Sequence, residues 1–326
     1  MKRARAWRRS LALGLVSLFV PAVSAGGERY ALIVAGASGG AAYAAQYAGW
    51  TAELHGILLE RMKLDRARVT VLSDAQDPEA MATAANVRRV FEAVREKSTR
   101  DDLFFIVLIG HGTFDGVDAK FNLVGPDLES GQWAELLGSV QAQAVIVNTT
   151  SASFPFVERL AGERRIVITA TDSAAQRFDT VFPGYFIQAL RDDGADIDKN
   201  GRVSIWEAFV AATRSVRLHY QQRGQLATER ALLDDNGDGV GREAAGAGED
   251  GSAASHTYLE DPVAGAPPTD EALLALLQKR ASLELEVEEL KVRRTFLPPE
   301  EYQREFERVM IELARVAREI RERNRS

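Results

Sequence analysis

The 326-residue chain contains no cysteine, and this absence limits both how its fold is held together and which chemistry it performs. Disulfide bonds are excluded, although the export signal described below leads to a compartment that allows them. A thiol nucleophile is excluded as well. The four histidines include no pair at the spacing of a zinc site. Packing or a metal must therefore stabilise the fold.

Apolar runs long enough to cross a membrane are also absent. Residues 1–25 read as the basic stretch MKRARAWRRS, the apolar stretch LALGLVSLFVPAV and the small residues VSA, a pattern typical of a secretory signal peptide. A membrane anchor is disfavoured because the apolar stretch is shorter than the roughly 20 residues that span a bilayer. We therefore expect cleavage after Ala25 and a periplasmic or secreted protein with no membrane attachment.

Basic residues are in the minority. The mature chain keeps 35 of the 40 Lys and Arg residues and all 47 Asp and Glu residues, a net charge of −12. Nucleic acid binding needs a basic surface, so we expect no nucleic acid partner. The stretch GASGG lacks the lysine of a P-loop and the glycine spacing of a dinucleotide site, so no nucleotide site is expected.

Short apolar runs alternate with amphipathic segments over residues 26–245. The runs YALIVAGASG, ARVTVLSD, DLFFIVLIGHG, QAVIVN and RRIVITAT predict strands, and the segments YAGWTAELHGILLERM, TAANVRRVFEAVREK and PFVERLA predict helices. Thr83 is a candidate helix cap. This order predicts an α/β fold with a mostly parallel sheet and helices on both faces, in which ligands bind at the carboxyl ends of the strands.

A calcium-binding loop is predicted at 196–207 from the sequence DIDKNGRVSIWE. A hard divalent cation needs several oxygen ligands, a glycine at the tight turn and a carboxylate twelve positions after the first. Gly201 occupies position 6 of this loop. The candidate ligand positions 1, 3, 5, 7, 9 and 12 are Asp196, Asp198, Asn200, Arg202, Ser204 and Glu207. We expect Ca²⁺ here as a structural clip.

A second, incomplete loop is present at 234–245. Asp234, Asn236 and Asp238 occupy positions 1, 3 and 5, and Gly239 occupies position 6. Position 12 is Ala245 instead of glutamate. The segment therefore binds calcium with fewer protein ligands or is a plain acidic turn.

The composition changes after residue 245. Residues 246–269 are rich in Gly, Ala, Ser and Pro, which predicts a flexible linker. Residues 270–326 carry apolar residues at steps of three and four, interrupted by LPPEE, which predicts a helical hairpin. Its apolar seam either packs on the α/β domain or mediates self-association or partner docking.

Two predicted strands end in residues that suggest a reaction site. His111 follows the buried strand in the stretch LIGHGTFDG, where flanking glycines let the imidazole lie exposed as a general base. The next strand is followed by the hydroxyl cluster NTTSAS. Over residues 28–245 the chain resembles the legumain-like cysteine peptidases, related in fold to caspases, in which one strand ends in Gly-His-Gly and the next leads into Cys-x-Ser-Gly. The later stretch RRIVITATDS is similar to part of that family's substrate pocket.

The chain departs from the family at the nucleophile. Aligning SASF with Cys-x-Ser-Gly places Ser151 on the cysteine, Ser153 on the serine and Phe154 on the glycine. A shift by one residue places Thr150 on the cysteine instead. The resemblance thus implies Ser151 as the candidate nucleophile, with His111 as its base.

Three readings of the function follow. The first is a non-catalytic member of this fold, stabilised by calcium, that binds a peptide or protein ligand in the cleft where the family binds its substrate. The second is a peptidase in which Ser151 replaces the family cysteine. A serine hydroxyl then needs an orienting third group, and Asp115 is the nearest carboxylate in the sequence. The third is a scaffold that acts through the C-terminal hairpin.

Overall fold

The computed structural model describes residues 27–176, 179–244, 250–261, 271–294 and 297–323. The predicted signal peptide lies outside these residues. Residues 250–261 fall inside the predicted linker and contain the short helix α7 (Ser252–Ser255). Its first turn is held by the Asp235 carboxylate, which accepts from the backbone N–H groups of Gly251 at 2.8 Å and Ala254 at 2.7 Å. The rest of the predicted linker, 246–249 and 262–269, is outside the described residues.

One six-stranded sheet organises the molecule, in the order β2-β1-β3-β7-β8-β9. Its strands are β1 (Arg29–Ala35), β2 (Val69–Leu72), β3 (Leu103–Ile109), β7 (Gln143–Asn148), β8 (Arg165–Thr169) and β9 (Leu232–Asp234). The first five run parallel, and β9 pairs antiparallel with β8. Every residue of β3 is buried, as its unbroken apolar sequence predicts. The predicted mostly parallel α/β fold is confirmed.

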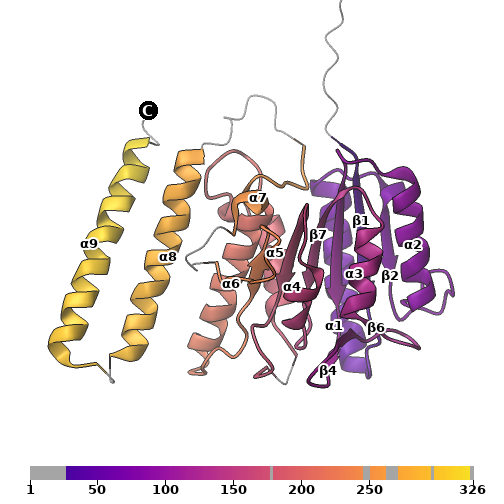
Figure 1. Cartoon of the computed structure of the whole chain (residues 1–326), viewed down its shortest axis with the longest axis horizontal. Helices are drawn as coiled ribbons and strands as arrows, with labels where there is room; N and C mark the ends of the chain where they lie inside the picture. Colours follow the sequence, from indigo (N-terminus) through magenta and orange to yellow (C-terminus); the bar gives the residue numbers. More distant parts are fainter. Residues whose placement is uncertain (1–26, 177–178, 245–249, 262–270, 295–296, 324–326) are drawn as a thin grey trace, which may run out of the picture.

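Helices cover both faces of this sheet (Figure 1). One face carries α1 (Ala41–Gly56), α5 (Phe182–Arg191) and α6 (Ile205–Gln222), and the other carries α2 (Ala84–Lys97), α3 (Ser130–Gly138) and α4 (Pro155–Leu160). Strand side chains alternate between the two cores: Ile33 and Phe105 face the first set of helices, and Leu32 and Phe104 face the second. Thr83 caps α2 as predicted, because its Oγ1 accepts from Asn86 N at 3.2 Å.

A small antiparallel sheet follows β3 directly. It consists of β4 (Gly112–Phe114), β5 (Ala119–Phe121) and β6 (Leu128–Glu129). The carbonyl oxygen of His111 accepts from Asn122 N at 3.1 Å, so this residue lies at the junction of the two sheets. Shorter helical turns occur at Ile57–Arg61, Arg66–Arg68 and Asp193–Ala195.

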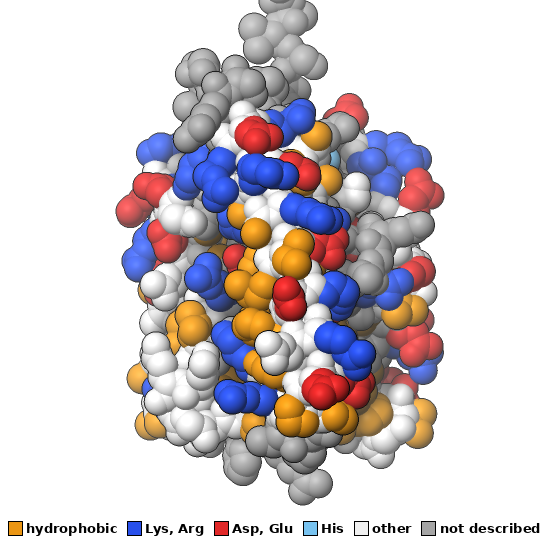
Figure 2. Space-filling model, turned by 90° about the vertical axis from the view of Figure 1, so that its left-hand side faces the viewer, with side chains coloured by type: hydrophobic (Ala, Val, Ile, Leu, Met, Phe, Trp, Pro, Cys, Tyr) orange, Lys and Arg blue, Asp and Glu red, His pale blue; other side chains and the backbone are white. Residues whose placement is uncertain are grey.

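Two long helices, α8 (Glu271–Arg293) and α9 (Pro299–Arg323), form a hairpin at one end of the long axis of the molecule (Figure 1). Their facing side chains form a separate apolar cluster, whose buried members include Leu273, Leu283, Val309 and Val316. Figure 2, which faces this end, shows a line of apolar side chains flanked by Lys and Arg. No helix in the described part of the chain is long and apolar enough to cross a membrane.

Candidate functional site

His111 lies at the carboxyl end of the sheet, immediately after Gly110, whose φ of 151° leads the chain out of β3. The His111 side chain is 29% exposed. Its Nδ1 is 3.1 Å from Asp179 Oδ1. Its Nε2 is 3.2 Å from both the Tyr47 hydroxyl and the Ser38 carbonyl oxygen. The imidazole is thus surrounded by partners from α1, the β1–α1 connection and the segment before α5.

These partners satisfy the ring in both of its charge states. The Asp179 carboxylate can only accept a hydrogen bond, so it favours the tautomer of His111 that carries its proton on Nδ1. In the neutral ring, Nε2 then accepts from the Tyr47 hydroxyl, and in the protonated ring it donates to the Ser38 carbonyl. Both nitrogens are therefore engaged by protein atoms.

Two tyrosines of α1, Tyr43 and Tyr47, pack against the paired side chains of His111 and Asp179. The ring centroids of Tyr43 and Tyr47 lie 4.8 Å and 5.7 Å from that of His111, both in edge-to-face geometry. The neighbouring Asp179 carboxylate raises the pKa of the Tyr43 phenol. Burial is the main cause that raises the pKa of Tyr47. Both phenols therefore remain protonated near neutral pH and act as hydrogen-bond donors.

The hydroxyl cluster after β7 is mostly occupied by structural bonds. Ser153 is fully buried, and its Oγ accepts from the backbone N–H groups of Ala170 at 3.1 Å and Thr171 at 3.2 Å. Thr149 Oγ1 donates to Leu108 O at 2.7 Å. Ser151 is partly exposed, and its hydroxyl has no hydrogen bond with His111 or with any other described residue. The structure therefore does not join the two candidate catalytic residues by a hydrogen bond.

Thr150 contacts the turn that carries His111. Its Oγ1 is buried without a hydrogen-bond partner among the described residues, and a β-carbon added at Gly112 would lie only 2.6 Å from it. Glycine at 112 is therefore needed for the close approach of the two strand ends. Phe154, the next residue after the hydroxyl cluster, has a ring centroid 5.0 Å from that of Phe114.

The carboxylate that orients His111 is one that sequence reasoning missed. Asp115 accepts from the backbone N–H groups of Val117 and Asp118, both at 2.9 Å, and these bonds lower its pKa. It closes the β4–β5 turn and is not paired with His111. Asp179, 68 residues after the histidine, takes that place. Only its position between β8 and a helix hinted at this role, because that connection opens at the carboxyl edge of the sheet.

Glu229 fixes the chain just beyond Asp179. It is 3% exposed, and its carboxylate accepts from Phe182 N at 2.6 Å, Val181 N at 3.0 Å and the Tyr220 hydroxyl at 3.0 Å. These bonds satisfy the free N–H groups at the start of α5. Burial nevertheless raises the pKa of Glu229 to about 7. A buried glutamate thus anchors the segment that presents Asp179 to the histidine.

The predicted calcium loop brings three carboxylates together. One oxygen each from Asp196, Asp198 and Glu207 lies within 4.8 Å of the others, and all three residues are buried. Desolvation is the main cause that raises the pKa values of Asp198 and Glu207. These groups could hold a metal ion, because a cation would offset the cost of burying the negative charges.

The backbone of the loop also suits a cation site. Gly201 has φ of 83° and Lys199 has φ of 61°, so the chain turns sharply around the Asp196 carboxylate. That carboxylate accepts from Asn200 N at 3.1 Å and Gly201 N at 3.0 Å. Ser204 and Glu207 form a capping box that opens α6. The candidate ligands thus converge from both ends of one tight loop.

The loop at 234–245 is less complete. Asp234, the last residue of β9, is buried and accepts from Gly237 N at 2.8 Å and Gly239 N at 2.9 Å. Asn236 and Asp238 are exposed, and Asn236 Nδ2 donates to Asp238 Oδ2 at 3.3 Å. Ala245 lies outside the described residues. Among those described, no three acidic groups converge in this loop as they do at 196–207.

Comparisons with known proteins name no family for this chain. No protein-family model matches it, and no curated protein matches it. Solved structures do match, among them protein GSU0716 from Geobacter sulfurreducens, a structural genomics target, at 15% sequence identity and a TM-score of 0.42. That match covers 64% of this chain and 92% of the other chain. A likeness of this size carries no information about activity.

Proposed function

We propose that this protein is an exported calcium-binding protein whose legumain- or caspase-like α/β domain binds peptide or protein without cleaving it. The observation that carries this proposal is the state of His111. A serine nucleophile needs a histidine nitrogen that takes its proton. Here Nδ1 contacts Asp179, and Nε2 contacts Tyr47 and Ser38, and neither nitrogen is hydrogen-bonded to the Ser151 hydroxyl.

Calcium is the proposed ion at 196–207. Oxygen atoms are the ligands that this cation prefers, and the chain offers the side chains of Asp196, Asp198, Asn200, Ser204 and Glu207 within one loop. Bound calcium supplies two positive charges, which offset most of the negative charge of the three buried carboxylates. Because the loop 234–245 has only one buried carboxylate, we restrict this proposal to 196–207.

The proposed ligand surface is the carboxyl edge of the sheet. Partly exposed Ser151 and the His111 side chain lie there, beside Tyr43, which is 37% exposed. The aromatic face of Tyr43 offers apolar contact to a peptide, and the Ser151 hydroxyl offers a hydrogen bond. Such a surface needs no nucleophile to bind its ligand.

An active serine peptidase is the second candidate, and one observation favours it. The 3.1 Å contact of Asp179 with Nδ1 orients the imidazole as the third member of a catalytic triad does. To complete that arrangement, the Ser151 hydroxyl would have to take the place of the Tyr47 hydroxyl as the partner of Nε2.

Peptide binding that does not depend on Ser151 is the expected result. The chain 26–326 would be incubated with a peptide library and calcium, bound peptides recovered by affinity capture and cleavage products sought by mass spectrometry. We expect captured peptides to bind the Ser151→Ala variant with unchanged affinity and to remain intact. Thr150→Ala is measured in the same way, because the alignment shifted by one residue places Thr150 on the family cysteine.

The opposite result would establish the peptidase. Cleavage by the native chain that falls about a thousand-fold or more in Ser151→Ala, and equally in His111→Ala, would show that the serine is the nucleophile. A folded protein that neither binds nor cleaves any peptide would exclude both candidates at this edge.

A further inference from the structure

The loop 196–207 makes apolar contacts that its proposed calcium role does not use. Ile197, at loop position 2, is partly buried and packs against both the core on the α5–α6 face and the apolar cluster of the α8–α9 hairpin. Within the described residues it is the one side chain of the α/β domain assigned to that cluster. The hairpin therefore meets the domain at the candidate calcium loop.

The chain that leads to the hairpin also lies on this loop. Tyr258 forms an antiparallel bridge with Ser204, and its hydroxyl accepts from Asn200 Nδ2 at 2.9 Å. The guanidinium of Arg202 lies 3.8 Å from the centre of the Tyr258 ring, which is cation–π geometry. Three candidate ligand positions, 200, 202 and 204, thus contact a single tyrosine.

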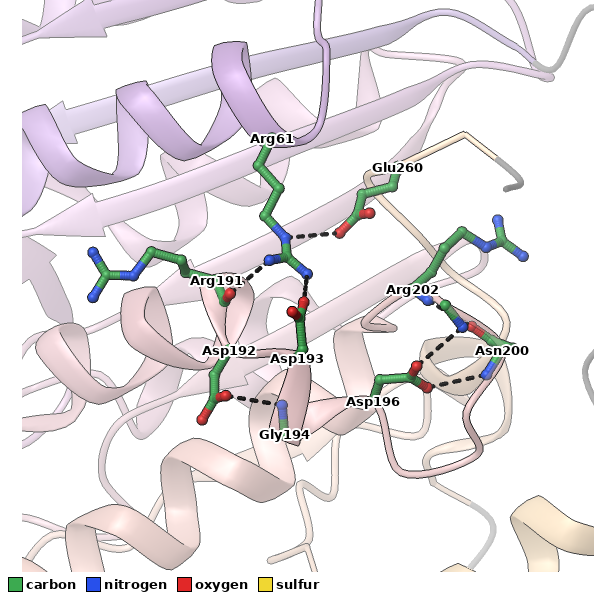
Figure 3. A network of polar contacts seen from close by, with 10 residues as sticks. Arg61, Arg191, Asp192, Asp193, Gly194, Asp196, Asn200, Arg202 and Glu260 are labelled. Carbon is green, nitrogen blue, oxygen red and sulfur yellow. Dashed lines mark hydrogen bonds and ion pairs between the residues drawn. The ribbon is translucent and has the colours of Figure 1, made fainter. Parts of the chain in front are cut away.

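Arg61 ties this segment to the residues before the loop (Figure 3). Its guanidinium donates to Glu260 Oε1 at 3.5 Å, to Asp193 Oδ1 at 2.7 Å and to the carbonyl oxygen of Arg191 at 2.7 Å. Both flanks of the loop, one before Asp196 and one leading to α8, are therefore held by the same side chain.

We infer that calcium at 196–207 favours docking of the α8–α9 hairpin onto the α/β domain, an inference that rests on the proposed calcium function. In the arrangement where Ile197 touches the hairpin, oxygens of Asp196, Asp198 and Glu207 lie within 4.8 Å of one another. Carboxylates this close repel when ionised. A cation that binds them stabilises this arrangement of the loop, and the Ile197 contact with it.

The hydrogen bonds inside the loop show how the ion and the isoleucine are coupled. Glu207 Oε1 accepts from the backbone N–H of Ile197 at 2.7 Å and of Asp198 at 3.2 Å. The same carboxylate is the candidate ligand at position 12. The positions of the Glu207 carboxylate and of the Ile197 backbone therefore depend on each other.

Thermodynamic linkage supplies a test, because docking must raise calcium affinity by the factor by which calcium favours docking. Val309 is fully buried in the hairpin cluster, whereas Ile311 on the same helix is 47% exposed. Titration calorimetry on full-length variants should show calcium binding about five-fold or more weaker in Val309→Asp than in the native chain. The matched Ile311→Asp variant should bind calcium normally.

A distance measurement tests docking directly. The chain has no cysteine, so spin labels can be placed at Leu226→Cys and Arg318→Cys, two exposed positions on the domain and on α9. Calcium should narrow the distribution of label distances, and a chelator should broaden it. Ile197→Ala should leave the distribution broad at saturating calcium.

The outcomes separate the two proposals. Equal calcium affinity in Val309→Asp and the native chain, or label distances that do not respond to bound calcium, would overturn the coupling and leave the calcium proposal intact. A native chain that binds no calcium in the calorimeter would overturn both.

Discussion

Glu207→Gln is expected to abolish the stabilisation of this protein by calcium. In a 12-residue calcium loop, the acid at position 12 supplies both of its oxygens to the ion. Glu207 is fully buried and 4.8 Å or less from Asp196 and Asp198 through their carboxylate oxygens. A glutamine keeps one oxygen and the size of the side chain, but it removes the charge and the second ligand atom.

The size of the expected effect follows from mass action. Extracellular calcium modules bind at roughly 0.1–1 mM, so 10 mM calcium should stabilise the native chain by about 1.4–2.7 kcal/mol. Urea unfolding with and without calcium measures this difference. Glu229→Gln is the matched control, because it neutralises another buried glutamate that accepts backbone N–H groups.

Calcium stabilisation that is equal in Glu207→Gln and the native chain would contradict the assignment of the site to this loop. Stabilisation that disappears in Asp238→Asn instead would place the ion at 234–245. The native chain should also lose the effect when a chelator is added in excess, since the ligands are oxygen atoms that release calcium readily at these affinities.

The native protein is also expected to lose stability as the pH rises from about 5 to 8, through Glu229. The unfolded carboxyl group ionises near its ordinary pKa of 4.5, whereas burial raises the pKa of the folded group to about 7. Between these values the folded state holds more protons, so the free energy of unfolding falls with increasing pH. The difference of 2.5 pKa units corresponds to about 3 kcal/mol.

Glu229→Gln isolates this contribution, because an amide resembles the protonated acid and does not titrate. Urea unfolding at several pH values should show that the native chain loses about 3 kcal/mol relative to the variant between pH 4.5 and pH 8. Parallel curves for the two proteins would mean that Glu229 ionises normally.

Most of the large elements could be predicted from the sequence because their signals are local. The strand Leu103–Ile109 is apolar at every position, and helix α2 has both an apolar stripe and a capping threonine. The convergence of Asp196, Asp198 and Glu207 could be anticipated because these residues belong to one twelve-residue motif. The strands β4, β5, β6 and β9 were missed, since two or three residues show no periodicity.

The partners of His111 could not be predicted, because they come together only in the folded chain. Ser38 lies before α1, Tyr47 lies in α1 and Asp179 lies before α5. Nothing in their spacing along the sequence relates them to residue 111. Asp115 is the nearest carboxylate in the sequence, but its turn directs it to the backbone of Val117 and Asp118. The local sequence identifies a histidine at a strand end, but the packing of α1 and of the segment before α5 determines its hydrogen-bond partners.

The short strand β9 has a consequence for how the sheet ends. Leu233, its middle residue, exchanges both backbone hydrogen bonds with Arg242, each at 2.9 Å, on the side away from β8. An edge strand with free N–H and C=O groups is a template for pairing with another chain. Here the one outward-facing residue is already paired, so this edge is closed to strand addition by a peptide or a second copy.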